Sequence, residues 1–110
     1  MQPNVPVVSV SDLPDDAVMV DVRERGEWVA GHAPEAVLIP MGDLPGQIGE
    51  LPIGDGPLAI VCRSGNRSGR AVAWLSHQGI DAVNVAGGMQ AWDAAGKPMV
   101  ADGAGPARVI

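Results

Sequence analysis

The only cysteine of the chain lies in the stretch Ile60-Val61-Cys62-Arg63-Ser64-Gly65-Asn66-Arg67-Ser68, between an apolar run and the start of a helix. Residues 58–61 are continuously apolar and predict a buried strand. Residues 67–78 predict a helix that ends before Gly79, with one face formed by Ala71, Trp74, Leu75 and Gln78. The stretch therefore predicts a strand, a tight loop and a helix in immediate succession.

This loop has the composition of an anion-binding site next to a reactive thiol. Backbone N–H groups of a tight loop can converge on one point, and the N-terminus of the following helix adds partial positive charge. A thiol held there ionises more readily than a free one, and the thiolate is the nucleophile. A cysteine at a strand end is often only a small buried apolar residue. Arg63 and Arg67, however, suit an anionic substrate and favour a reactive Cys62.

The loop and three other segments together resemble the rhodanese-like sulfurtransferases. Residues 62–68 are similar to the active-site loop of that family, and Leu38-Ile39-Pro40 is similar to one of its strand ends. Residues 21–32, from Asp21 through Arg23, Glu27 and Trp28 to Gly31-His32, resemble the signature D-x-R-x-x-x-E-aromatic-x-x-G-H. Residues 83–92 and 96–98, with Gly87-Gly88, Trp92, Gly96 and Pro98, resemble the pattern L-x-G-G-apolar-x-x-W-x-x-x-G-x-P. The chain departs from the family at Ala33-Pro34-Glu35-Ala36, where the turn into the third strand is expected to differ.

The order of patterns predicts an α/β fold. Strands are expected at residues 7–10, 17–22, 36–39, 58–61 and 82–85, and helices at 24–30, 67–78 and 88–95, with a weak helix within 40–57. Together with the resemblance, they predict a single rhodanese-like domain with a mainly parallel central sheet of about five strands and helices on both faces. The domain is expected to fill residues 1–110, with a core over about 7–98 and a tail over 99–110.

The resemblance implies that the chain is a thiosulfate sulfurtransferase with Cys62 as its catalytic nucleophile. The Cys62 thiolate would take sulfane sulfur from thiosulfate or a persulfide donor, and a thiophilic acceptor such as a cellular or protein thiol would then remove it. The donor is expected to contact Arg63, Ser64, Gly65, Asn66, Arg67 and Ser68. No metal or organic cofactor is expected. A persulfide carrier or protein-interaction module with little bulk turnover is the alternative.

A phosphatase or arsenate reductase is less favoured. Those enzymes use a C-x5-R loop in which the arginine clamps a tetrahedral oxyanion. Here Ser68 occupies that position and Arg67 comes one residue early. The shorter loop suits a single sulfur atom better than a phosphate group.

Several residues outside the loop have structural roles in this interpretation. Asp21 and Arg23 are expected to form an ion pair that steadies neighbouring loops, and His32 is expected to stabilise a turn. Gly87-Gly88 would permit a tight turn, with Trp92 in the core. The hydroxyls of Ser64 and Ser68 are expected to cap the helix or to bind the anion.

Composition narrows the partners and the compartment. The net charge of −6 and the seven scattered basic residues argue against nucleic-acid binding, and no apolar run approaches the length of a membrane span. One cysteine cannot form an internal disulfide, and with two separated histidines it gives no zinc spacing. The first residues lack the pattern of a signal peptide, so the cytoplasm is expected, with an exported form that has lost its leader as the other option.

Overall fold

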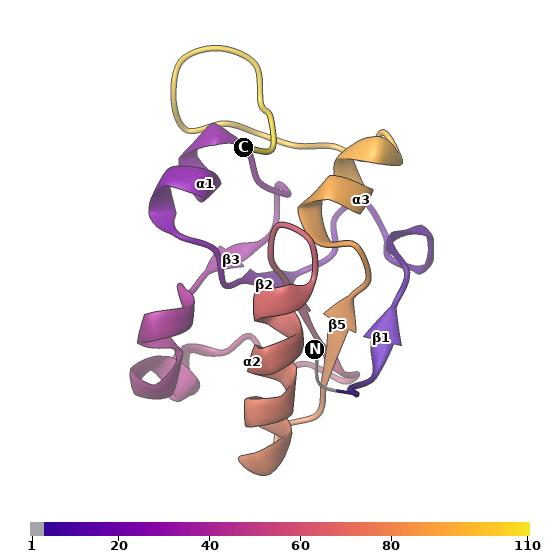
Figure 1. Cartoon of the computed structure of the whole chain (residues 1–110), viewed down its shortest axis with the longest axis vertical. Coiled ribbons are helices and arrows are strands. Elements are labelled where there is room, and N and C mark those ends of the chain that lie inside the picture. Colours follow the sequence, from indigo (N-terminus) through magenta and orange to yellow (C-terminus); the bar gives the residue numbers. More distant parts are fainter. Residues whose placement is uncertain (1–3) are drawn as a thin grey trace.

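The computed structural model describes residues 4–110, in which five strands form one sheet in the order β1-β5-β4-β2-β3 (Figure 1). The strands are β1 (Val7–Val8), β2 (Met19–Asp21), β3 (Val37–Leu38), β4 (Leu58–Val61) and β5 (Ala82–Val85). The helices are α1 (Arg25–Ala30), α2 (Asn66–His77) and α3 (Gly88–Ala94), with 3₁₀ segments η1 (Val10–Asp12) and η2 (Met41–Glu50). Each pair of neighbouring strands is parallel, which confirms the predicted fold class.

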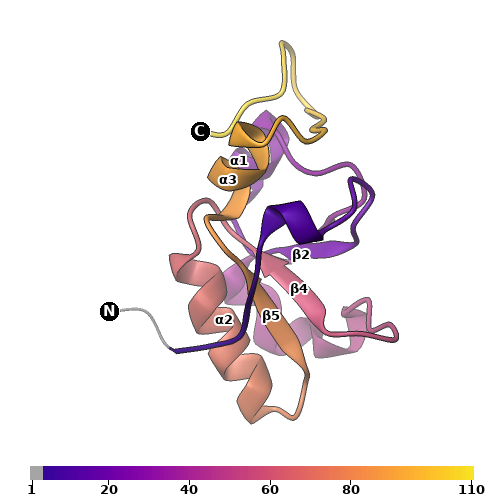
Figure 2. The ribbon, with the colours of Figure 1, turned by 90° about the vertical axis from the view of Figure 1, so that its right-hand side faces the viewer.

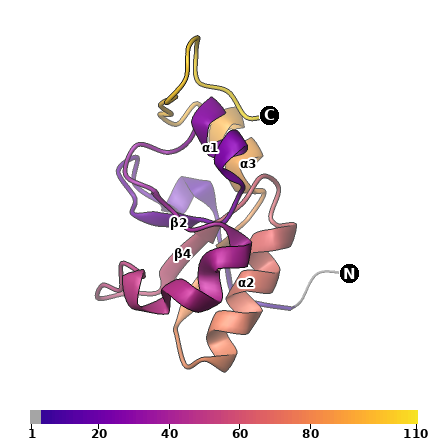
Figure 3. The same cartoon turned by 90° about the vertical axis from the view of Figure 1, so that its left-hand side faces the viewer.

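Helices cover both faces of the sheet because side chains alternate along each strand. In β4, Leu58 and Ile60 pack in a core that includes Val72 and Leu75 of α2, and η2 contributes to the same core. Ala59 and Val61 face the opposite way and pack with η1 and α3, whose Trp92 is fully buried. Figures 2 and 3 show α2 on one side of β4, with η2 beside it in Figure 3.

The strand order brings the loops after β2 and β4 together. β3 lies outside β2, and β5 lies outside β4, so the sheet order reverses between β2 and β4. In parallel sheets, ligands bind beyond the carboxyl ends of the strands at such a reversal. β2 ends at Asp21 and β4 ends at Val61, directly before Cys62. The topology thus places Cys62, which follows β4, beside the residues that directly follow Asp21 at the end of β2.

Two predicted helices differ in detail from the structure. Residues 41–50 form 3₁₀ turns rather than an α-helix, and Pro45 within them cannot donate a backbone hydrogen bond. Leu44 is nevertheless buried, as its spacing indicates. In α2 the buried side chains include Ala71, Val72 and Leu75, whereas Gln78 is exposed beyond the last helical residue. Gln78, whose spacing placed it on the same helix face as Ala71 and Leu75, is the C-cap residue of α2 and lies outside the core.

Residues 99–110 contain no named helix or strand, yet they are held against α1. Val100 and His32 exchange two backbone hydrogen bonds of 2.9 Å. The N–H of Asp102 donates to the carbonyl of Val29 at 3.0 Å, and the N–H of Arg108 donates to the carbonyl of Ala30 at 2.9 Å. In Figure 1 this segment, drawn in yellow, arches over α1. No helix within residues 4–110 is long and apolar enough to cross a membrane.

Candidate active site

Cys62 lies at the end of β4 with 1% of its surface exposed. Its carbonyl accepts a hydrogen bond from the N–H of Met89 at 2.8 Å, and the carbonyl of Arg63 accepts one from Gln90 at 3.0 Å. Because the C=O and N–H of one trans peptide unit point in opposite directions, the N–H groups of Arg63 and Ser64 face away from α3. The start of α3 therefore orients the first peptide units of the loop.

The sulfur of Cys62 receives hydrogen bonds from its own loop. The backbone N–H of Gly65 lies 3.0 Å from Sγ, and the hydroxyl of Ser68 lies 3.2 Å from it. Gly65 has φ 111°, a left-handed conformation that favours glycine, and it precedes the first residue of α2. The loop thus directs a backbone donor and a side-chain donor at one atom, as its composition indicates.

These donors change the ionisation of the thiol. Burial of the sulfur opposes ionisation, but the Ser68 hydroxyl and the N–H groups of Ser68, Gly65 and Ser64 outweigh it and lower the pKa of Cys62. A lowered pKa increases the fraction of thiolate at neutral pH, and the thiolate is the nucleophilic form. The site therefore has the property that a nucleophilic cysteine needs.

Replacing Ser68 by Ala should shift the reactivity of Cys62 to higher pH. For the wild type, the rate of alkylation by iodoacetamide should rise with pH and have its midpoint below about 8.5, the pKa typical of a free cysteine thiol. Loss of the hydroxyl donor raises the pKa of Cys62, so the Ser68→Ala profile should have a higher midpoint and a slower rate at neutral pH. Ser76→Ala, an exposed change on the same helix, is the control. Superimposable profiles for wild type and Ser68→Ala would contradict this role.

Asn84 of β5 belongs to the site, although the sequence analysis gave it no role. Its Oδ1 accepts from the hydroxyl of Ser68 at 2.6 Å, and its Nδ2 donates to the carbonyl of Gly65 at 3.1 Å. Asn84 therefore holds both residues that donate to the sulfur. The available signal was a polar residue inside the apolar strand Val83-Asn84-Val85, since a buried polar side chain in such a strand needs specific partners.

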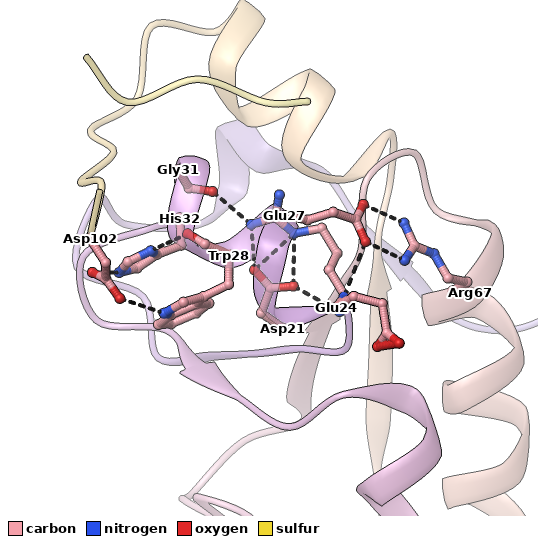
Figure 4. Close-up of polar contacts among 9 residues, drawn as sticks. Asp21, Glu24, Glu27, Trp28, Gly31, His32, Arg67 and Asp102 are labelled. Carbon is pink, nitrogen blue, oxygen red and sulfur yellow. Dashed lines mark hydrogen bonds and ion pairs between the residues drawn. The ribbon is translucent and has the colours of Figure 1, made fainter. Parts of the chain in front are cut away.

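The two loop arginines have partners within the chain. Arg67 donates through Nη1 and Nη2 to the two carboxylate oxygens of Glu27, at 2.7 and 2.9 Å (Figure 4). Arg63 is exposed, and its Nε donates to the carbonyl of Ile110 at 3.1 Å. Of the other predicted donor-binding residues, Ser64 and Asn66 are exposed at the loop surface, whereas Gly65 and Ser68 are buried beside the sulfur.

Asp21 and Arg23 form the predicted ion pair below this site. Both side chains are fully buried, and Arg23 Nη2 lies 2.8 Å from Asp21 Oδ2. Arg23 also donates to the carbonyl of Gly31 at 2.8 Å. Figure 4 shows Asp21, Gly31 and the neighbouring His32, whose Nδ1 lies 2.8 Å from the carbonyl of Trp28. The pair joins the end of β2 to the end of α1, which supports a structural role.

The start of α2 can now be compared with the role expected for Ser64 and Ser68. The N-cap residue of α2 is Gly65, which has no side chain to cap the helix. The single hydroxyl proton of Ser68 is shared between Asn84 Oδ1 at 2.6 Å and the sulfur of Cys62 at 3.2 Å. Within residues 4–110, no three side chains of His, Cys, Asp or Glu gather closely enough to hold a metal ion. The chemistry that this arrangement can supply is nucleophilic attack by a thiolate whose products are stabilised by N–H donors.

Comparison with known proteins identifies the family. The pattern of the Rhodanese-like domain family matches residues 9–95. The chain belongs to the rhodanese-like domain family. A sulfurtransferase of Allochromatium vinosum is 41% identical over 88 residues, which cover 79% of this chain and 81% of that protein. The thiosulfate sulfurtransferase GlpE of Pseudomonas savastanoi is 37% identical over 79 residues, 71% of this chain and 74% of its own.

A solved structure agrees with the assignment. The crystal structure of a rhodanese-related protein from Thermoplasma volcanium matches with a TM-score of 0.77 and 36% identity. The match covers 86% of this chain and 97% of that one. In this rhodanese-like domain, the loop and the signature segment of residues 21–32 meet through the contact between Arg67 and Glu27. The resemblance based on separate motifs is thereby confirmed for the fold and the family.

Proposed function

We propose that the protein is a sulfurtransferase that moves sulfane sulfur from thiosulfate or a persulfide donor to a thiophilic acceptor through a persulfide on Cys62. The observation that carries the proposal is the pair of donors, from Gly65 and Ser68, aimed at a buried sulfur whose pKa is lowered. The family and the names of the relatives support a sulfurtransferase in general. The persulfide chemistry is the finer part of the proposal.

The reaction has two displacement steps. In the first, the Cys62 thiolate attacks the outer sulfur of thiosulfate, a new S–S bond forms, and the old S–S bond breaks with its electron pair leaving on sulfite. In the second, an acceptor thiolate or cyanide attacks the outer sulfur of the persulfide and restores the Cys62 thiolate. The N–H groups of residues 63–68 would stabilise the negative charge on the terminal sulfur, as an oxyanion hole does for oxygen. All atoms come from donor, acceptor and Cys62, so the steps need no cofactor.

The same chemistry supports expectations for the acceptor and for the compartment. We expect a small thiol or a protein thiol to remove the sulfur, and we expect neither nucleic acid nor a membrane as a partner. A free thiol that must stay reduced fits the cytoplasm, where disulfides are rare. If turnover with small acceptors is slow while Cys62 loads readily, the domain acts as a persulfide carrier for a protein partner.

Intact mass tests the central step. After exposure to thiosulfate, the wild-type protein should gain the mass of one sulfur atom, and a reducing thiol should remove it. Prior alkylation of Cys62 should prevent the gain. A protein that remains at its starting mass with thiosulfate and also with a small persulfide would refute the proposal.

Aryl phosphates should not be hydrolysed. Ser68, at the position of the phosphatase arginine, lies 3.2 Å from the sulfur of Cys62, and Arg67 is bound to Glu27. The loop therefore lacks both the space and the free guanidinium that would clamp a phosphate. Release of nitrophenol from an aryl phosphate, measured beside persulfide formation on the same preparation, would favour the phosphatase interpretation if it depended on Cys62.

A further inference from the structure

The positive charge of Arg67, expected beside Cys62, is offset by the carboxylate of Glu27 on α1. Glu27 and Arg67 lie 40 residues apart in the sequence and form a two-pronged ion pair, with 18% and 30% of their side chains exposed. The hydrogen bond from Arg67 lowers the pKa of Glu27, so the carboxylate is ionised at neutral pH. The same hydrogen bond raises the pKa of Arg67, and the charge of the Cys62 thiolate adds to that effect. Arg67 is thus close to the sulfur but paired.

The second arginine is also engaged. Arg63 Nε donates to the carbonyl of Ile110 at 3.1 Å. With the amide oxygen of Gln90 turned toward it, Arg63 donates to that oxygen through Nη1 and Nη2, both at 3.1 Å. Neither loop guanidinium therefore presents its paired donors to an incoming sulfonate, which is the geometry that arginine uses for such anions. The chain as a whole carries a net charge of −6, which adds no attraction for anions.

We propose that Glu27 sets the donor class of this site, disfavouring the doubly charged thiosulfate ion and favouring the persulfide of a small thiol. This inference rests on the proposed function, since it assumes that Cys62 accepts sulfur. Thiosulfate brings two negative charges toward the Cys62 thiolate, while the Glu27 carboxylate offsets the charge of Arg67. A thiol persulfide carries at most one negative charge and has no sulfonate that needs a clamp. Glu27 acts through Arg67 and is a positioning residue in this scheme.

The favoured step balances without any further reactant. The Cys62 thiolate attacks the outer sulfur of R–S–S–H, a new S–S bond to Cys62 forms, and the S–S bond of the donor breaks. The electron pair leaves on the R–S sulfur, which takes the proton as R–SH. Cys62 is left as a persulfide anion beneath the N–H groups of Gly65 and Ser64, which are among the donors that lower its pKa. The loop donors thus serve this step without either arginine.

The test compares two donors in four proteins: wild type, Glu27→Gln, Glu27→Gln/Arg67→Gln and Glu35→Gln. The Glu27→Gln change removes the charge but retains a side-chain oxygen that can accept from the N–H of Glu24, as the Glu27 carboxylate does at 3.1 Å. Glu35 is exposed in the turn before β3, so Glu35→Gln makes the same change in net charge away from the site. The measurement is the single-turnover rate of persulfide formation on Cys62, with kcat/KM, KM and kcat determined separately for thiosulfate and for a persulfide of an uncharged small thiol.

Glu27→Gln should raise kcat/KM for thiosulfate by about tenfold, mainly through a lower KM, because Arg67 becomes available to the sulfonate. In the same variant, kcat/KM for the persulfide should change by less than about threefold. The double variant should not show the higher kcat/KM for thiosulfate, because it lacks Arg67. Glu35→Gln should match wild type. In a second readout that needs no turnover, sulfate should protect Cys62 of Glu27→Gln from iodoacetamide at lower concentration than it protects wild type.

Two outcomes would overturn the inference. In the first, the ratio of kcat/KM for thiosulfate to kcat/KM for the persulfide is the same in folded Glu27→Gln as in Glu35→Gln, and sulfate protects Cys62 as it does in wild type. The other needs only the wild type, which keeps the inference testable if Glu27→Gln does not fold. For each donor, the rate constant with the wild-type protein is divided by the rate constant of the same donor with free cysteine. A larger quotient for thiosulfate than for the persulfide excludes the inference. Both outcomes leave the proposed function intact, whereas failure of both donors to load Cys62 would refute the proposed function first.

Discussion

Cys62→Ser should abolish sulfur transfer while leaving the fold unchanged. Serine is nearly isosteric with cysteine, and its oxygen can still accept from Gly65 and Ser68, which lie 3.0 and 3.2 Å from the present sulfur. A serine hydroxyl is a weak nucleophile without a neighbouring base, and it cannot form a persulfide. We expect the rate of thiocyanate formation from thiosulfate and cyanide to fall by at least about 10⁴-fold. Intact mass should show no added sulfur.

The fold of Cys62→Ser can be checked separately. Circular dichroism and thermal unfolding should place its stability within about 1 kcal/mol of wild type, because volume and hydrogen bonds are largely preserved. Thiosulfate-dependent thiocyanate formation in a folded Cys62→Ser protein would exclude Cys62 as the sulfur carrier. Wild-type protein carried through the same purification gives the reference rate.

Gly88→Ala should have the second largest effect, because it displaces the backbone that contains Cys62. A Cβ added at Gly88 would lie 2.6 Å from the carbonyl oxygen of Arg63 and would also collide with the carbonyl of Cys62. Both neighbours are backbone atoms, so the loop or the start of α3 must move. Since displacements near 1 Å at a reacting group can lower rates about 100-fold, we expect sulfur transfer to fall by about that factor. The free energy of unfolding should decrease by about 3 kcal/mol.

Gly96→Ala is the matched control for that substitution. Gly88 and Gly96 have φ values of 59° and 72°, so alanine at either position has a similar conformational cost of about 1 to 2 kcal/mol. Nothing lies within 4 Å of a Cβ built on Gly96. A larger loss of stability and activity in Gly88→Ala than in Gly96→Ala therefore measures the collision with the loop. Equal losses would show that the close approach of α3 has no part in positioning Cys62.

The sequence was most informative where local pattern and tertiary packing agree. β4 and β5 have the predicted bounds because short apolar runs bounded by turn residues are buried on both faces. The helix after Cys62 was predicted to within one residue at each end. The buried pair of Asp21 and Arg23 was also expected, since two opposite charges at a strand end need each other when they leave water.

The remaining features depend on contacts between distant segments. Nothing local in the sequence around Arg67 specifies that its guanidinium meets Glu27, which lies on α1. Sequence alone therefore predicted a free charge for the substrate where the fold forms an ion pair. Asn84 was missed for the same reason, because its partners Gly65 and Ser68 come from another strand-to-helix connection. Whether the six loop residues bind a donor stays a prediction.

The contacts of residues 99–110 with α1 predict that these two segments open together. α1 has only six residues and no buried side chain, and helices this short are not stable alone in water. Its carbonyls at Val29 and Ala30 accept hydrogen bonds from Asp102 and Arg108. Segments that open together in this way exchange their amide hydrogens with one shared opening free energy. We therefore expect release of residues 99–110 to loosen the helix that carries Glu27, which would couple the ion pair of Arg67 to the opening of a segment far away in the sequence.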